Sequence, residues 1–258
     1  MAADAWEASK AASEAGAGLP PVGDLFGRLA KDVQASLVPH LMAGLGYAMV
    51  QLPLVILAVL VIYGGMFAGM YWGLENLSED ELGLAMMAGA MAGLSVVAVP
   101  LMILMPPLTA SLYRAVYAWQ ARGEPLGIGA AFSTATQDLP RVYLATFTIG
   151  MVIFLGMLMC YLPGLIAAFA LHFAYMRVVI HRRGVLDGIQ DSWVHVADHA
   201  GWNLGVFAIG FAISFALSNI PLIGVILAVV LATSWNLHAY RAAYPEPAPI
   251  AGEEPALG

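Results

Sequence analysis

The chain has 258 residues, of which 61% are hydrophobic and only 10% are charged. Soluble domains carry about 25% charged residues, so this composition excludes an ordinary soluble domain and indicates that the solvent is lipid. The net charge of −7 without a basic patch argues against nucleic acid as a partner. The single cysteine, Cys160, excludes an intrachain disulfide and a cysteine-based metal cluster.

The two ends of the chain differ from its interior. Residues 1–23 and 245–258 are rich in Ala, Gly, Pro and acidic residues. Residues 1–23 lack the basic start and apolar core of a cleaved signal peptide. We therefore expect two disordered cytoplasmic tails on either side of one membrane domain, residues 24–244.

The interior predicts an all-α integral membrane protein with six transmembrane helices. A helix needs about 20 apolar residues to cross a hydrocarbon core of about 30 Å, and six segments qualify: residues 51–72, 82–108, 142–161, 164–180, 202–217 and 221–240. Three segments, residues 24–38, 126–139 and 185–200, each precede a pair of spans and have the apolar spacing of an amphipathic helix at the membrane surface. This order predicts a three-fold repeat of helical hairpins.

Basic residues predict the orientation. With six spans, all Lys and Arg residues fall on one side of the membrane: Lys10, Arg28, Lys31, Arg114, Arg122, Arg141, Arg177, Arg182, Arg183 and Arg241. The first loop on the other side is acidic, with Glu75, Glu79, Asp80 and Glu81. Cytoplasmic loops retain Lys and Arg, so we expect both termini in the cytoplasm, with the amphipathic helices on the same side.

Small residues recur at every fourth position in the first two predicted spans. They are Gly65 and Gly69 in the first span, and Ala85, Gly89 and Gly93 in the second. Such spacing permits close approach of two helix backbones within lipid. We expect these residues to pack the first hairpin together, with an interface between subunits as the alternative.

One polar stripe is a candidate metal site. Asp187, Asp191, His195 and His199 are spaced four apart, so neighbours in the series share one face of a helix. Two carboxylates and two imidazoles could hold a divalent ion such as zinc and support a metal-dependent membrane enzyme. The alternative is that the stripe is the wet face of a surface helix, opposite the apolar stripe of Leu186, Ile189, Trp193, Val196 and Ala200.

A family resemblance follows from residues 176–193, which read MRVVIHRRGVLDGIQDSW, and from the preceding turn Leu162-Pro163-Gly164. Over residues 110–244 the chain resembles uncharacterised bacterial multi-pass proteins. These are related to the membrane domain attached to some glycerophosphoryl diester phosphodiesterases. The resemblance implies a location in the bacterial cytoplasmic (inner) membrane. It implies no activity, and the chain contains no soluble phosphodiesterase domain.

The sequence favours a role without catalysis. The central portions of the predicted spans carry no Asp, Glu, Lys or Arg, which proton and ion relays need. The chain has no Walker loop and no G-x-S-x-G elbow. We therefore expect a scaffold or accessory subunit that needs no cofactor and packs against membrane lipids and a protein partner or a second copy. The alternative is a transporter or channel for a lipid or small solute.

Overall fold

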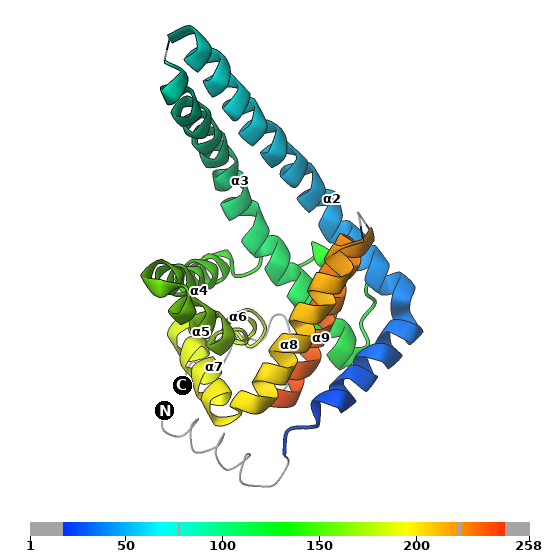
Figure 1. The fold of residues 1–258 in the computed structure, drawn as a ribbon. Helices are drawn as coiled ribbons and strands as arrows, with labels where there is room; N and C mark the ends of the chain where they lie inside the picture. Colours follow the sequence, from blue (N-terminus) through cyan, green and yellow to red (C-terminus); the bar gives the residue numbers. More distant parts are fainter. Residues whose placement is uncertain (1–17, 77, 221–222, 246–258) are drawn as a thin grey trace.

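The computed structural model describes residues 18–76, 78–220 and 223–245, and this part of the chain is helical, without strands (Figure 1). Five of its helical segments are long and apolar enough to cross a membrane: Leu37–Asn76, Glu81–Arg122, Leu139–Cys160, Leu162–Val179 and Ala200–Leu217. The prediction of an all-helical chain with membrane-spanning helices is confirmed at this level. Most of the two predicted tails, residues 1–17 and 246–258, lies outside the described residues.

The first two helices form a long hairpin that extends away from the rest of the chain (Figure 1). They are α2 (Val22–Asn76) and α3 (Glu79–Arg122). The backbone N–H of Ser78 donates to the Glu81 carboxylate over 3.2 Å, which satisfies a donor at the start of α3. The helix ends at Gly123, whose φ of 69° is a left-handed conformation that glycine adopts without strain.

The predicted surface helix 24–38 and the first predicted span are parts of one helix, α2. Pro39 and Pro53 lie inside it. An internal proline removes one backbone hydrogen bond and bends a helix, and α2 changes direction in its N-terminal part (Figure 1). The sequence analysis therefore separated two segments that the structure joins in one helix.

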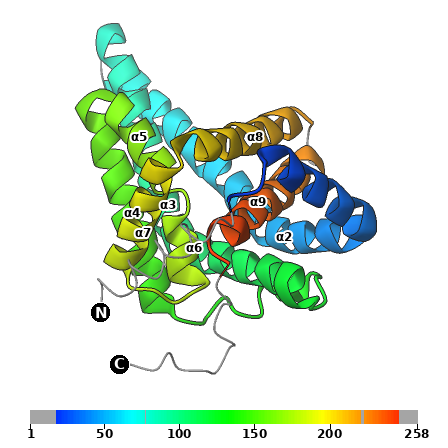
Figure 2. The same ribbon diagram turned by 90° about the horizontal axis from the view of Figure 1, so that it is seen from below.

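The remaining helices pack around the end of the hairpin that holds both the start of α2 and the end of α3. They are α4 (Leu139–Cys160), α5 (Leu162–Ala170), α6 (Ala174–Val179), α7 (Val185–Asp198), α8 (Ala200–Ser218) and α9 (Ile223–Ala243). The α4–α5 and α8–α9 hairpins lie on different sides of α3 in both views (Figures 1 and 2).

Three predicted segments differ from the observed helices. Residues 126–138 form turns and the short 3₁₀ helix η1 (Gly129–Ala131), where we expected an amphipathic helix. The fourth predicted span is divided into α5 and α6 by a turn at residues 171–173. The sixth predicted span corresponds to α9, which is not among the five qualifying helices, and its first residues, 221–222, lie outside the described part.

The core occupies only one end of the molecule. Its largest fully buried side chains include Trp235, Tyr240 and Phe173, which pack with residues from α2, α3, α6 and α8. We call this region the hub, residues 22–50, 105–138, 171–206 and 226–245. The rest of the first hairpin, residues 51–76 and 78–104, is called the distal hairpin. Among its described residues, Ala85 and Val97 are the only buried hydrophobic side chains.

Candidate functional site

The small residues of the first hairpin lie where α2 and α3 touch. A Cβ atom added to Gly65 would overlap the carbonyl oxygen of Gly89, and one added to Gly69 would overlap that of Ala85. At Gly93 an added Cβ would lie 2.5 Å from the carbonyl oxygen of Val61. The structure thus brings all five predicted packing residues to one contact between two helices of the same chain.

The structure does not bring the four candidate metal ligands into one group. Among the described residues, no three His, Cys, Asp or Glu side chains are placed to hold a metal ion. Asp191 accepts hydrogen bonds from Nε and Nη2 of Arg177 at 2.9 and 2.6 Å. The rings of His195 and His199 stack with centroids 4.9 Å apart, while Asp187 is exposed.

The stripe that contains these residues lies partly against the protein. The Arg177 guanidinium is buried and lies over the ring of Tyr244 at 4.4 Å. His195 packs against the same ring, with centroids 5.2 Å apart, and burial lowers the pKa of His195 to about 4, with smaller contributions from His199, His172 and Arg177. The predicted wet face is therefore partly covered by the protein: Asp187 is exposed, and Asp191, His195 and His199 are half-buried.

The predicted apolar stripe of α7 is also only partly correct. Leu186 and Trp193 are exposed, as expected for contact with membrane headgroups. The buried face consists instead of Val185, Gly188, Ser192 and Val196. Ser192 donates to the carbonyl oxygen of Ala170 over 2.7 Å, so α7 is held to α5 by a buried hydrogen bond as well as by close packing.

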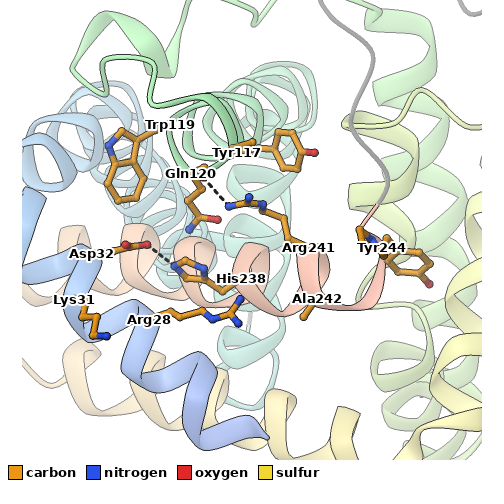
Figure 3. Close-up of a pocket in the computed structure, with 12 residues that line it drawn as sticks. Arg28, Lys31, Asp32, Tyr117, Trp119, Gln120, His238, Arg241, Ala242 and Tyr244 are labelled. Atoms are coloured by element: carbon orange, nitrogen blue, oxygen red, sulfur yellow. Dashed lines mark hydrogen bonds and ion pairs between the residues drawn. The ribbon is translucent and has the colours of Figure 1, made fainter. Parts of the chain in front are cut away.

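A polar hollow lies in the hub between α2, α3 and α9 (Figure 3). Its volume is about 660 Å³. Three basic side chains line it: Arg28 and Lys31 from α2 and Arg241 from α9. We call it the first cavity. Its walls also include Tyr117, Trp119 and Gln120 of α3, and Ala242, Tyr244 and Pro245 at the end of α9.

A histidine–carboxylate contact and a hydrogen bond connect the walls of the first cavity. Nε2 of His238 lies 2.6 Å from a carboxylate oxygen of Asp32, which links α9 to α2. Nη1 of Arg241 donates to the backbone oxygen of Gln120 over 2.7 Å, which links α9 to α3. Figure 3 shows Arg28 reaching from α2 toward His238, with Arg241 on the α3 side. These two contacts hold α2, α3 and α9, which are distant in sequence, around the first cavity.

A second cavity of about 430 Å³ lies on the other side of Tyr117 and is also basic. Arg114 donates to the backbone oxygens of Thr134 and Gln137 at 3.0 and 3.2 Å. Arg182 lies 3.3 Å from the carboxylate of Asp138. Arg122, the third basic residue of its lining, is paired with Glu124 at 2.5 Å. Each cation of the second cavity therefore has a partner within the chain.

Sequence reasoning did not find the first cavity. Arg28 and Arg241 lie at opposite ends of the chain, and no local motif joins them. One signal was present, because the distribution of basic residues placed all of them on the same side of the membrane. That pattern predicts a common end of the bundle but does not show which side chains share a cavity.

Comparison with protein families matches part of the chain to a known family model. The model of a domain of unknown function, DUF7847, matches residues 122–254, which is just over half of the chain. The chain belongs to the DUF7847 family. The DUF7847 match covers α4 to α9 and leaves out α2 and nearly all of α3. Of the basic residues in the first cavity, it includes Arg241 but not Arg28 or Lys31.

The DUF7847 match carries no link to glycerophosphoryl diester phosphodiesterases. Searches of curated proteins and of solved structures gave no match.

Proposed function

We propose that this DUF7847 protein is a scaffold or accessory subunit of a membrane complex. The observation that carries the proposal is the exposure of the first hairpin. In the most apolar windows of α2 and α3, only 17% and 11% of the residues are buried, compared with 17% in both α4 and α8 and 56% in the span formed by α5 and α6. Large side chains such as Phe67, Tyr71 and Met102 are exposed along it. A surface of this kind requires lipid or protein to cover it.

The length of the hairpin supports a protein partner beside lipid. The part of each helix in the distal hairpin, residues 51–76 of α2 and 79–104 of α3, contains 26 residues, which corresponds to about 39 Å at 1.5 Å per residue. A hydrocarbon core of about 30 Å would accommodate this length only at a tilt of about 40°, the upper end of the usual range of 0–40°. At the average tilt of about 20°, one end of the distal hairpin lies outside the hydrocarbon core, where apolar side chains favour protein contacts.

The proposal includes six spans with both termini in the cytoplasm, α9 being the sixth, and three repeated hairpins, α2–α3, α4–α5 and α8–α9. It also includes the bacterial inner membrane as location.

The single cysteine tests the orientation, because Cys160 is exposed at the end of α4. In sealed cells, a membrane-impermeant maleimide is expected to label Cys160 from outside. Labelling only after the cytoplasmic side is opened would reverse the proposed orientation.

Photo-crosslinking in native membranes tests the scaffold role. A photoreactive amino acid replaces Phe67 of α2 or, as a matched control, Phe154 of α4; the two side chains are 57% and 55% exposed. We expect a discrete protein adduct from position 67 and mainly lipid adducts from position 154. Native mass spectrometry of the gently extracted protein then gives the mass of the partner or of a second copy. A lone chain with lipid adducts at both positions would overturn the proposal.

One observation favours a transporter or channel for a lipid or small solute as the second candidate. Polar side chains continue from the first cavity into the interior of the hub. His40 of α2 lies 3.1 Å from the hydroxyl of Ser234 of α9, and Tyr47 lies 3.2 Å from the hydroxyl of Thr109 of α3. Flux of lipid or solute in liposomes that contain the purified chain alone would favour this candidate over the scaffold.

A further inference from the structure

We propose that the first cavity binds a phosphate group, carried either by an anionic phospholipid headgroup or by free phosphate. The inference goes beyond the scaffold role and does not rest on it, because binding requires only the folded chain. It begins from the charges of the lining: the side chains of Arg28, Lys31 and Arg241 are positive, and Asp32 is the one carboxylate among the lining residues.

The basic side chains of the first cavity retain free donors. Within the described part of the chain, Arg28 and Lys31 make no hydrogen bond or ion pair. Arg241 donates through Nη1 to Gln120, which leaves its other N–H donors available. Asp32 is paired with His238. The first cavity therefore differs from the second, where Arg114, Arg122 and Arg182 all have partners.

Chemistry favours phosphate as the ligand of such a cavity. Guanidinium groups donate two parallel hydrogen bonds to phosphate oxygens, and charge-assisted bonds of this kind are about twice as strong as neutral ones. An anion between Arg28 and Arg241 would also relieve the repulsion between like charges held on separate helices. Arg28 and Lys31 are three residues apart and share one side of α2, so a single anion can contact both.

The size and place of the first cavity agree with this ligand. Its volume of about 660 Å³ lies within the range of roughly 300–1,000 Å³ for small-molecule sites, so it has room for a glycerophosphate headgroup as well as for phosphate. In the proposed orientation it opens on the cytoplasmic side. Basic pockets between transmembrane helices on that side bind the headgroups of anionic lipids.

Titration calorimetry of the full-length protein in detergent tests the inference. The probes are a short-chain phosphatidic acid, the matching zwitterionic phosphatidylcholine, and inorganic phosphate. Arg28→Gln removes one unpaired charge from the first cavity. Arg122→Gln removes one charge from the second cavity and is the matched control, because both arginines are exposed. We expect Arg28→Gln to weaken phosphatidic acid binding about tenfold and Arg122→Gln to leave it unchanged.

The probes identify the source of the phosphate. Binding of phosphatidic acid without binding of inorganic phosphate assigns the cavity to a lipid headgroup. Binding of both, with the same loss in Arg28→Gln, shows that free phosphate is sufficient. No binding of either probe would overturn the inference, as would equal weakening by Arg28→Gln and Arg122→Gln. Unchanged helical circular dichroism of both variants shows that a loss of binding is not a loss of folding.

Discussion

The hub and the distal hairpin are held together by different interactions. In the hub, large side chains such as Trp235 and Tyr240 are fully buried, and several buried polar groups are paired across helices. The indole N–H of Trp235, for example, donates to the backbone oxygen of Val206 over 2.8 Å. In the distal hairpin, two backbones approach closely at Gly65 and Gly89, and large side chains point outward.

This difference shows how one chain adapts to two environments. Lipid removes the hydrophobic drive for helix association, so small residues that permit close packing hold the distal hairpin. The hub collects the charged ends of its helices, where polar groups must be paired because burial of an unpaired charge is costly. Substitutions at paired charges are therefore expected to affect the hub, and substitutions at glycines the distal hairpin.

The largest effect is expected from Arg177→Met, which leaves Asp191 without its partner. The Arg177 side chain is only 4% exposed, and its guanidinium lies 2.6 Å from the carboxylate. The Asp191 carboxylate left behind is 35% exposed, so water offsets part of the roughly 3–5 kcal/mol that breaking a fully buried ion pair costs, and about 2–3 kcal/mol is expected. The free energy of unfolding, measured by denaturant titration in detergent micelles with tryptophan fluorescence, is expected to fall by that amount.

An exposed ion pair provides the control. Arg122 and Glu124 are 39% and 52% exposed, and pairs at the surface contribute about 0–1 kcal/mol. Arg122→Gln is therefore expected to change the free energy of unfolding by less than about 1 kcal/mol. If Arg177→Met were as mild as Arg122→Gln, the hub would not depend on its buried charges.

A second substitution, Gly65→Leu, is expected to disrupt the distal hairpin and to leave the hub intact. Gly65→Leu places side-chain atoms where the carbonyl oxygen of Gly89 lies, so the helices must separate, at a cost of about 1–3 kcal/mol. Gly64 is exposed with no atom within 4 Å of an added Cβ. Gly64→Leu is therefore expected to be neutral or to stabilise the helix by up to about 1 kcal/mol.

Spin labels measure this separation directly. Phe67 of α2 and Met87 of α3 are exposed on the distal hairpin, and cysteines there can be labelled once Cys160 is replaced by serine. The distance between labels is expected to increase in Gly65→Leu and to stay unchanged in Gly64→Leu. Equal distances in both variants would show that the hairpin does not depend on close contact at this position.

The sequence predicted the helices that are long enough to cross a bilayer better than the segments that are held by long-range contacts. Long apolar runs predicted α4 and α8 to within three residues at each end, because one physical requirement, the thickness of the bilayer, defines them. Residues 126–138 were predicted as a helix from apolar spacing. In the structure, the carbonyl oxygens of Thr134 and Gln137 accept hydrogen bonds from Arg114. A long-range contact of this kind has no local signal.

The candidate site was harder to predict than the fold. The four-residue spacing correctly placed Asp191 and His195 on one stripe of a helix, α7. Spacing alone did not show that Arg177 would form an ion pair with the Asp191 carboxylate or that the ring of Tyr244 would pack against His195. The first cavity could not be derived because its charges come from residues 28–32 and 238–241, which only tertiary packing brings together.

A pH dependence of stability is expected of the hub alone. Burial lowers the pKa of His195 to about 4 in the folded chain, against about 6.5 for an unperturbed histidine. Between these values the unfolded chain binds the proton and the folded chain does not, so stability falls as the pH decreases through this window and is complete above about pH 6.5. From pH 7 to pH 5 the free energy of unfolding is expected to fall by roughly 2 kcal/mol.

His195→Phe tests whether this histidine is the cause. The variant keeps a ring against Tyr244 but cannot be protonated, so its stability is expected to change less between pH 7 and pH 5 than that of the natural chain. The label distance across the distal hairpin serves as the internal control, because residues 51–104 contain no histidine. An unchanged pH slope in His195→Phe would assign the effect to another group. A shift of the label distance over the same range would show that the hub and the distal hairpin respond as one unit.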